Sequence, residues 1–190
     1  MSKAVMISIQ PHWCEMIANG EKTIEIRKTR PKLETPFKCY IYCTKPRFEH
    51  EDFFALVGKQ GFYGGGKVIG EFVCDGIVWL ARVGFTRRGG EPEYRIANNG
   101  DWKSPIGRLL EEACLTEEGV DAYLGGNPGF GWHISDLKIY DKPRKPDEFE
   151  RPYECDECTA QWASECNACH KERKIKRPPQ SYCFVEALQT

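Results

Sequence analysis

GEKTIEIR, at residues 20–27, joins a short amphipathic segment to an alternating one. Within it Thr23, Glu25 and Arg27 fall on one side of an extended strand, and the two isoleucines fall on the other, because successive side chains of a strand point to opposite faces. Lys22 has the opposite parity, so it must reach the polar side from the preceding turn. The pattern predicts a strand with one apolar face and one charged face.

The segments on either side of this strand fit an α+β fold. AVMISI at residues 4–9 predicts a strand, and Pro11 can begin a short helix that places Trp13, Met16 and Ile17 on one face. Gly20 is a typical residue to end such a helix. FKCYIYCTK at 37–45 and KVIGEFVCDGIVWL at 67–80 are rich in β-branched and aromatic residues, which predicts two further strands.

The second half of the chain alternates between helical and extended patterns. Residues 81–104 are polar, contain glycine and show no period, which indicates an irregular insertion. Ser104-Pro105 is a typical helix start, and a second short helix around Val120 is expected to stop at Gly125-Gly126. FGWHISDLKIY at 130–140 predicts a strand whose alternation changes phase near Asp136, which indicates a bulge.

The chain closes with SYCFVEAL at 181–188, which predicts a final strand. Five or six strands with short helices between them predict an α+β domain built round a small mixed β-barrel, with short flanking helices. The length of 190 residues fits a single domain, 1–190.

Composition excludes a membrane span and favours a cytoplasmic location. The chain is 41% hydrophobic and 29% charged, and no apolar run approaches the length that a bilayer crossing requires. The apolar run before Gln10 is too short for a secretory signal. Residues 1–48 hold nine Lys and Arg against four Glu, which suits a positive face for an anionic ligand.

Four of the ten cysteines have the spacing of a metal site. Cys155 and Cys158 form one C-x-x-C pair, and Cys166 and Cys169 form the next pair seven residues later. Two such pairs can hold one tetrahedral Zn²⁺ through four thiolates. A closed four-cysteine shell leaves no position for water or substrate, so the predicted zinc is structural.

The zinc segment is expected to be an insertion before the last strand. Its seven-residue interval is too short for a separate domain, so residues 151–177 are interpreted as a zinc-knuckle loop within the barrel domain, with a basic run at its end. His170 follows the last cysteine and is an alternative ligand. Disulfides or free thiols are the other interpretation, which a reducing compartment disfavours. The remaining six cysteines are expected to pack in the core.

Several of these motifs together resemble the ASCH domain family, within the PUA-like superfamily. The resemblance rests on G-x-K-x-x-E-x-R at residues 20–27 after a tryptophan-bearing helix, and on KVIGEF at 67–72, EACLT at 112–116, GWHI at 131–134 and PPQS at 178–181. It covers the chain apart from residues 81–104, and it is similar to phage or prophage members of the family.

The resemblance implies a PUA-like barrel whose cleft binds RNA or a modified nucleotide. The implied ligand-binding residues are Lys22, Thr23, Glu25, Arg27 and Trp132. Lys22 and Arg27 suit phosphate, Arg27 in a bidentate manner, and Glu25 suits an exocyclic amine. Trp132 suits a core position or a stacking surface for a base. A surface ion pair between Glu25 and Arg27 is the alternative interpretation.

The resemblance also implies enzymatic alternatives, and the sequence leaves open whether any turnover occurs. Some small relatives look like amidohydrolases that act on acylated cytidine nucleosides. Lys22 matches their lysine, and Glu112 is the candidate for their glutamate, but Glu25 stands where they have threonine. Other relatives resemble ribonucleases, in which Lys, Arg and a carboxylate stabilise charge. A phage protein that acts on a host protein is a further possibility, and the oligomeric state is not indicated.

Overall fold

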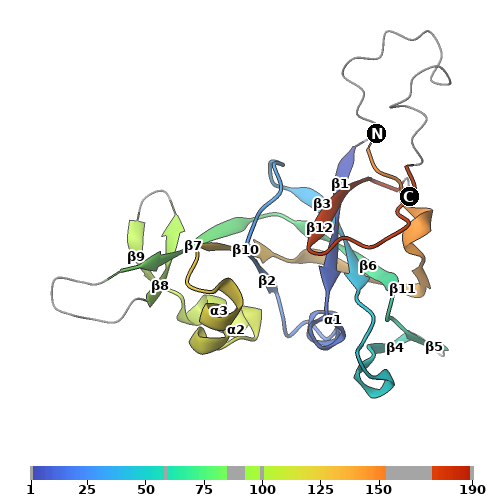
Figure 1. Ribbon diagram of the computed structural model, residues 1–190, viewed down its shortest axis with the longest axis horizontal. Helices are drawn as coiled ribbons and strands as arrows, with labels where there is room; N and C mark the ends of the chain where they lie inside the picture. The colour runs from blue at the N-terminus through green and yellow to red at the C-terminus, as the bar shows by residue number, and fades with distance from the viewer. Residues whose placement is uncertain (1, 58–59, 85–92, 99–100, 153–172, 189–190) are drawn as a thin grey trace, which may run out of the picture. The chain divides into compact units, whose positions relative to one another are not determined.

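The computed structural model describes residues 2–57, 60–84, 93–98, 101–152 and 173–188 (Figure 1). The chain divides into two compact units, each assembled from separate segments. The first unit consists of residues 1–11, 38–71 and 139–190, and the second consists of residues 12–37 and 72–138.

The first unit is built on a five-stranded sheet with the order β11-β6-β3-β1-β12. Its strands are β1 (Lys3–Ile9), β3 (Phe37–Cys43), β6 (Lys67–Cys74), β11 (Ser135–Arg144) and β12 (Tyr182–Glu186). Strand β1 pairs in parallel with β3 and antiparallel with β12. The predicted first and last strands are therefore confirmed, and they are neighbours in the sheet.

Smaller elements complete the first unit. These are the hairpin of β4 (Phe54–Val57) and β5 (Gln60–Tyr63), and two 3-10 turns, η1 (Glu49–Glu51) and η2 (Pro146–Glu148). Apolar side chains from β1, β3, β6 and β12 pack with Phe149 and Ile175 into one core. Burial of such side chains provides the main favourable free energy of folding.

The second unit is built on a five-stranded antiparallel sheet with the order β2-β10-β7-β8-β9. Its strands are β2 (Ile24–Arg27), β7 (Ile77–Val83), β8 (Glu93–Asn98), β9 (Asp101–Pro105) and β10 (Gly129–His133). Its helices are α1 (Pro11–Ala18), α2 (Gly107–Ala113) and α3 (Glu117–Leu124). The predicted helices at Pro11 and Val120 are confirmed, and Gly125 ends α3 with a left-handed φ of 64°.

Helices α2 and α3 pack against one face of this sheet (Figure 1). The isoleucines of β2 contribute to this core together with Leu80, Leu109 and Leu124. Gly131 of β10 leaves room between the sheet and α2, because a Cβ there would lie 2.8 Å from Val78 Cγ2 and 3.4 Å from Leu109 Cδ1. The apolar face predicted for residues 20–27 is thus the face that α2 and α3 cover.

The predicted β-barrel is wrong. The described strands form two open five-stranded sheets and one two-stranded sheet, and the edge strands of each larger sheet do not pair with each other. A barrel closes only when its two edge strands pair. In the second unit, β8 and β9 extend the sheet beyond β7 instead, so that β9 and β2 become separate edges.

Three local predictions also need correction. Residues 81–104 are not irregular throughout, because β8 and β9 lie within them and Tyr94 is buried in the core. Residues 67–80 form two strands, β6 and β7, separated by Asp75 and Gly76. Ser104-Pro105 belongs to β9, and α2 begins at Gly107. The expected break near Asp136 is confirmed, because β10 ends at His133 and Asp136 has a φ of 46°.

Candidate functional site

The turn between α1 and β2 places Lys22 at the start of the polar cluster. Gly20 takes a φ of 77°, which the absence of a side chain permits at no steric cost. The backbone amides of Glu21 and Lys22 then donate to the carbonyl of Met16 at 2.9 and 3.1 Å. Lys22 therefore leaves the turn before strand alternation begins, as the sequence required.

The backbone of Thr23 fixes the entry into β2. Its amide donates to the carbonyl of Glu112 in α2 at 2.8 Å, and its carbonyl accepts from the amide of Ile134 at 2.8 Å. These two bonds tie the start of the strand to the end of α2 and to the end of β10. The side chains that follow are thereby held in a defined register.

Lys22, Glu25 and Arg27 converge on one another. Lys22 Nζ lies 3.5 Å from Glu25 Oε2, and Arg27 Nε lies 3.1 Å from Glu25 Oε1. All three residues are buried, with exposed fractions of 3%, 7% and 6%. The surface ion pair that was the alternative interpretation is therefore wrong, because these charges lie inside the protein.

The ammonium group of Lys22 has two further contacts. Lys22 Nζ donates a hydrogen bond of 2.6 Å to the carbonyl of Ala113, the last residue of α2. A cation at this position satisfies one of the carbonyl groups that a helix end leaves unpaired. The same nitrogen lies 5.0 Å from the centroid of the Trp13 ring, within cation–π range.

Burial changes the protonation of this lysine. It lowers the pKa of Lys22, because a desolvated ammonium group is disfavoured, while the nearby carboxylate of Glu25 acts in the opposite direction. A lysine with a lowered pKa beside a carboxylate is a chemical arrangement often found at functional sites.

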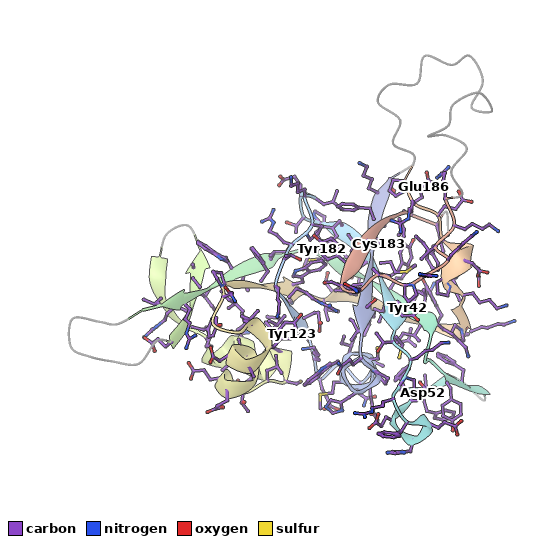
Figure 2. The ribbon with its side chains drawn as sticks, in the orientation of Figure 1. Tyr42, Asp52, Tyr123, Tyr182, Cys183 and Glu186 are labelled. Carbon is purple, nitrogen blue, oxygen red and sulfur yellow. The ribbon has the colours of Figure 1, made fainter. Side chains whose placement is uncertain are left out.

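Tyr123 of α3 and Cys114 join the cluster without having been predicted. The hydroxyl of Tyr123, whose side chain is labelled in Figure 2, accepts a hydrogen bond from Arg27. Burial raises the pKa of Tyr123, and the positive charge of Arg27 opposes this. Cys114 follows α2 with a φ of 53°, and its Sγ donates to the carbonyl of Glu21 at 3.4 Å.

Neither residue could have been found from the sequence pattern. Tyr123 stands in a helical period that predicts a core position, yet it is 41% exposed and meets Arg27 at the edge of the sheet. Cys114 looked like one of the scattered core cysteines, of which Cys14, Cys39, Cys43 and Cys74 are buried. Only the packing of α2 and α3 on β2 brings Tyr123 and Cys114 to the cluster.

The other predicted site residues have different surroundings. Trp132 is fully buried, and its ring packs edge-on against Phe37 with a centroid distance of 5.9 Å. It forms part of the core in this structure, and base stacking on it remains a prediction. The Glu112 carboxylate lies 3.0 Å from Arg108 Nε on the outer side of α2.

His133 lies on the surface beside Asp75. The His133 Nδ1 and Asp75 Oδ1 atoms are 2.6 Å apart, and both side chains are nearly half exposed. The hydrogen bond to His133 lowers the pKa of Asp75.

The predicted zinc ligands Cys155, Cys158, Cys166 and Cys169 lie outside the described residues, and so does His170. Among the residues that the structure does describe, no group of three or more His, Cys, Asp or Glu side chains could hold a metal ion. The described helices include none that is long and apolar enough to cross a membrane.

Two crystal structures of ZmASCH from Zymomonas mobilis resemble this chain along almost its whole length. A Tyr-to-Phe mutant is 18% identical, covers 97% of this chain and 91% of its own, and has a TM-score of 0.53. A Ser-to-Ala mutant is 20% identical, with 96% and 88% covered and a TM-score of 0.55. The chain has the ASCH fold. No family model matches the sequence, and no curated protein matches it either.

Within this ASCH fold, the cluster is built on an edge strand. Among the described strands, β2 pairs with β10 alone, and its charged face carries Glu25 and Arg27. The same residues that suggested the ASCH resemblance are therefore the ones that the fold gathers into one buried group.

The buried ion cluster predicts unequal stabilities for two Glu-to-Gln variants. Glu25→Gln removes the carboxylate that both buried cations contact, and breaking a buried pair in this way costs about 3 kcal/mol. Glu112→Gln removes only the exposed pair with Arg108 and is expected to cost less than about 1 kcal/mol. Urea unfolding of both variants and the parent measures the difference. Equal stability of the two variants would contradict the described burial of the cluster.

Proposed function

We propose that this chain is an ASCH-family protein that binds RNA or a modified nucleotide through Lys22, Glu25 and Arg27. The observation that carries the proposal is the burial of two cations with a single carboxylate. The cluster brings two cationic side chains to one carboxylate in a site largely removed from water.

The two cations of the cluster favour an anionic ligand. Burying a charge is costly unless it is paired, and Lys22 and Arg27 share the carboxylate of Glu25. A phosphate oxygen near Arg27 would add a negative charge beside the two cations through charge-assisted hydrogen bonds. Glu25 can at the same time accept from an exocyclic amine of a base.

Tyr123 marks the side from which a ligand reaches the cluster. Its side chain is 41% exposed, whereas the guanidinium group that it contacts is buried. A ligand that approaches beside Tyr123 therefore meets Arg27 first and Lys22 last, because Lys22 is held at the end of α2. Thr23 is half-buried at the start of the same strand.

An enzyme that uses the same cluster is the second candidate, and the lowered pKa of Lys22 favours it. A lower pKa increases the fraction of the lysine that is unprotonated near neutral pH, and this is the form that acts as a general base. Substrates of this class are acylated cytidine nucleosides or RNA. The carboxylate beside Lys22 is that of Glu25 at 3.5 Å, while Glu112 is paired with Arg108. A catalytic role for Glu112 therefore has less support than one for Glu25.

Arg27→Lys tests the binding proposal. The substitution keeps the charge but removes the planar fork that binds phosphate in a bidentate manner. Affinity for mixed-sequence single-stranded RNA and for cytidine monophosphate is expected to fall about 10-fold, because a hydrogen bond between charged groups contributes about 1.5–3 kcal/mol. Arg108→Lys, on the exposed side of α2, is the matched control and is expected to bind as the parent does. Fluorescence anisotropy over a range of salt concentrations measures the change.

Two outcomes would count against pure binding. If Arg27→Lys and Arg108→Lys bind equally well, the cluster is a structural ion group and the proposal is wrong. If the parent converts acylated cytidine or RNA and Lys22→Met does not, the protein is an enzyme. In that case its rate should rise with pH below the usual titration range of lysine, since Lys22 acts after losing its proton.

We also propose that residues 151–177 contain one structural zinc ion held by Cys155, Cys158, Cys166 and Cys169. The thiolate spacing is the basis, and the flanking residues support it. The amide of Arg151 donates to the carbonyl of Arg173 at 2.8 Å, and Glu150 pairs with Lys174 in an antiparallel bridge. The two ends of the cysteine segment are thus held together, which suits a loop closed by a metal.

Native mass spectrometry tests the zinc proposal. One zinc ion per chain is expected, and Cys155→Ser with Cys166→Ser should lose it, because two of the four thiolates are removed. Cys183→Ser removes a cysteine of β12 instead, and this control should keep the metal. A parent chain that folds and carries no zinc after expression with excess zinc would contradict the proposal.

A further inference from the structure

The strand register aligns Arg27 with two aromatic residues on neighbouring strands. Arg27 of β2 lies directly opposite Phe130 of β10, and Phe130 lies directly opposite Trp79 of β7. Side chains of directly opposed residues in an antiparallel sheet share one face. Arg27, Phe130 and Trp79 therefore form a row across three strands, which we call the aromatic row.

The aromatic row is accessible to a ligand. Trp79 is 40% exposed and Phe130 is half-buried. Tyr123 of α3, which is 41% exposed, contacts Arg27 from outside the row. Among the described residues of the second unit, the exposed large hydrophobic side chains are those of Trp79 and Tyr123. Trp79 thus lies at one end of the row, and Tyr123 contacts Arg27 at the other end.

Positive charge is concentrated beside Arg27. The residues that follow β2 include Lys28, Arg30 and Lys32, all of them exposed, against one acidic residue, Glu34. Lys28 Nζ lies 5.4 Å from the centroid of the Tyr123 ring. Cations interspersed with exposed aromatic rings are the combination that proteins use to bind single-stranded nucleic acid.

We infer that the aromatic row is a stacking surface for the bases of single-stranded RNA. This inference rests on the proposed function, since Arg27 belongs both to the row and to the buried cluster. Each strand step is about 4.8 Å, so Trp79 lies about 10 Å along the sheet from the β2 position of Arg27. That reach exceeds one nucleotide, so a strand whose phosphate meets Arg27 and Lys28 can place the next bases on Phe130 and Trp79.

The surface selects single strands over duplexes and over isolated nucleotides. Bases in a duplex are stacked on each other and do not offer their faces to a protein ring, whereas unpaired bases do. An isolated nucleotide at the cluster does not extend to Trp79. The contribution of Trp79 should therefore appear only with an oligonucleotide.

Trp79→Ala tests the inference, with Trp79→Phe and Tyr63→Ala as controls. Affinity for mixed-sequence single-stranded RNA should fall about 10-fold in Trp79→Ala, the loss typical of one base–aromatic stack. Trp79→Phe keeps an aromatic face and should bind within about 2-fold of the parent. Tyr63, on β5, is also exposed but lies outside the row, so its removal should change nothing. Cytidine monophosphate and double-stranded RNA should bind all four proteins with unchanged affinity.

The possible failures are distinguishable. If the parent binds the single strand, Arg27→Lys weakens it and Trp79→Ala does not, the aromatic row is wrong and the proposed function stands. If Tyr63→Ala weakens binding as much as Trp79→Ala does, the row is equally wrong. If the parent binds neither RNA nor nucleotide, the proposed function fails, and the inference fails with it.

Discussion

A buried ammonium group connects the parts of the second unit that carry its chemistry. Lys22 Nζ donates to the last carbonyl of α2, lies 3.5 Å from the Glu25 carboxylate and lies over the ring of Trp13. Removing a charge from water is expensive, so each of these contacts compensates part of the same cost. The positions of α1, α2 and β2 are consequently coupled through one nitrogen atom.

This arrangement has a structural and a functional interpretation. Arg27, the second cation, is the residue on which the two interpretations differ. A lysine that only caps α2 needs one carboxylate for balance, which Glu25 provides. Arg27 brings another buried positive charge to the same carboxylate at 3.1 Å. In line with the proposed function, we interpret this second cation as part of a site for an anionic ligand, since hydrogen bonds between charged groups are strong. The ASCH fold alone does not decide between a structural and a ligand-binding role for the cluster, because one fold supports many functions.

The sequence predicted the cluster better than it predicted the sheet that holds it. Alternation in GEKTIEIR places Glu25 and Arg27 on one face, and the turn at Gly20 accounts for Lys22, so local rules sufficed. The strands at 93–105 were missed, because their polar and glycine-bearing surroundings hide a short alternation that becomes clear only when Tyr94 packs in the core. Without these two strands, the sequence pattern predicts a closed barrel. Tyr123, likewise, meets Arg27 only through the packing of α3, which no local pattern encodes.

The central claim is that Lys22, Glu25 and Arg27 together form a ligand site, and a crystal structure of the chain grown with a short single-stranded RNA tests it most directly. The account predicts a phosphate group within hydrogen-bond distance of the Arg27 guanidinium, with Tyr123 displaced from it or lying alongside the nucleotide. RNA bound elsewhere, with the Arg27 hydrogen bond to Tyr123 and both ion pairs of Glu25 unchanged, would contradict it.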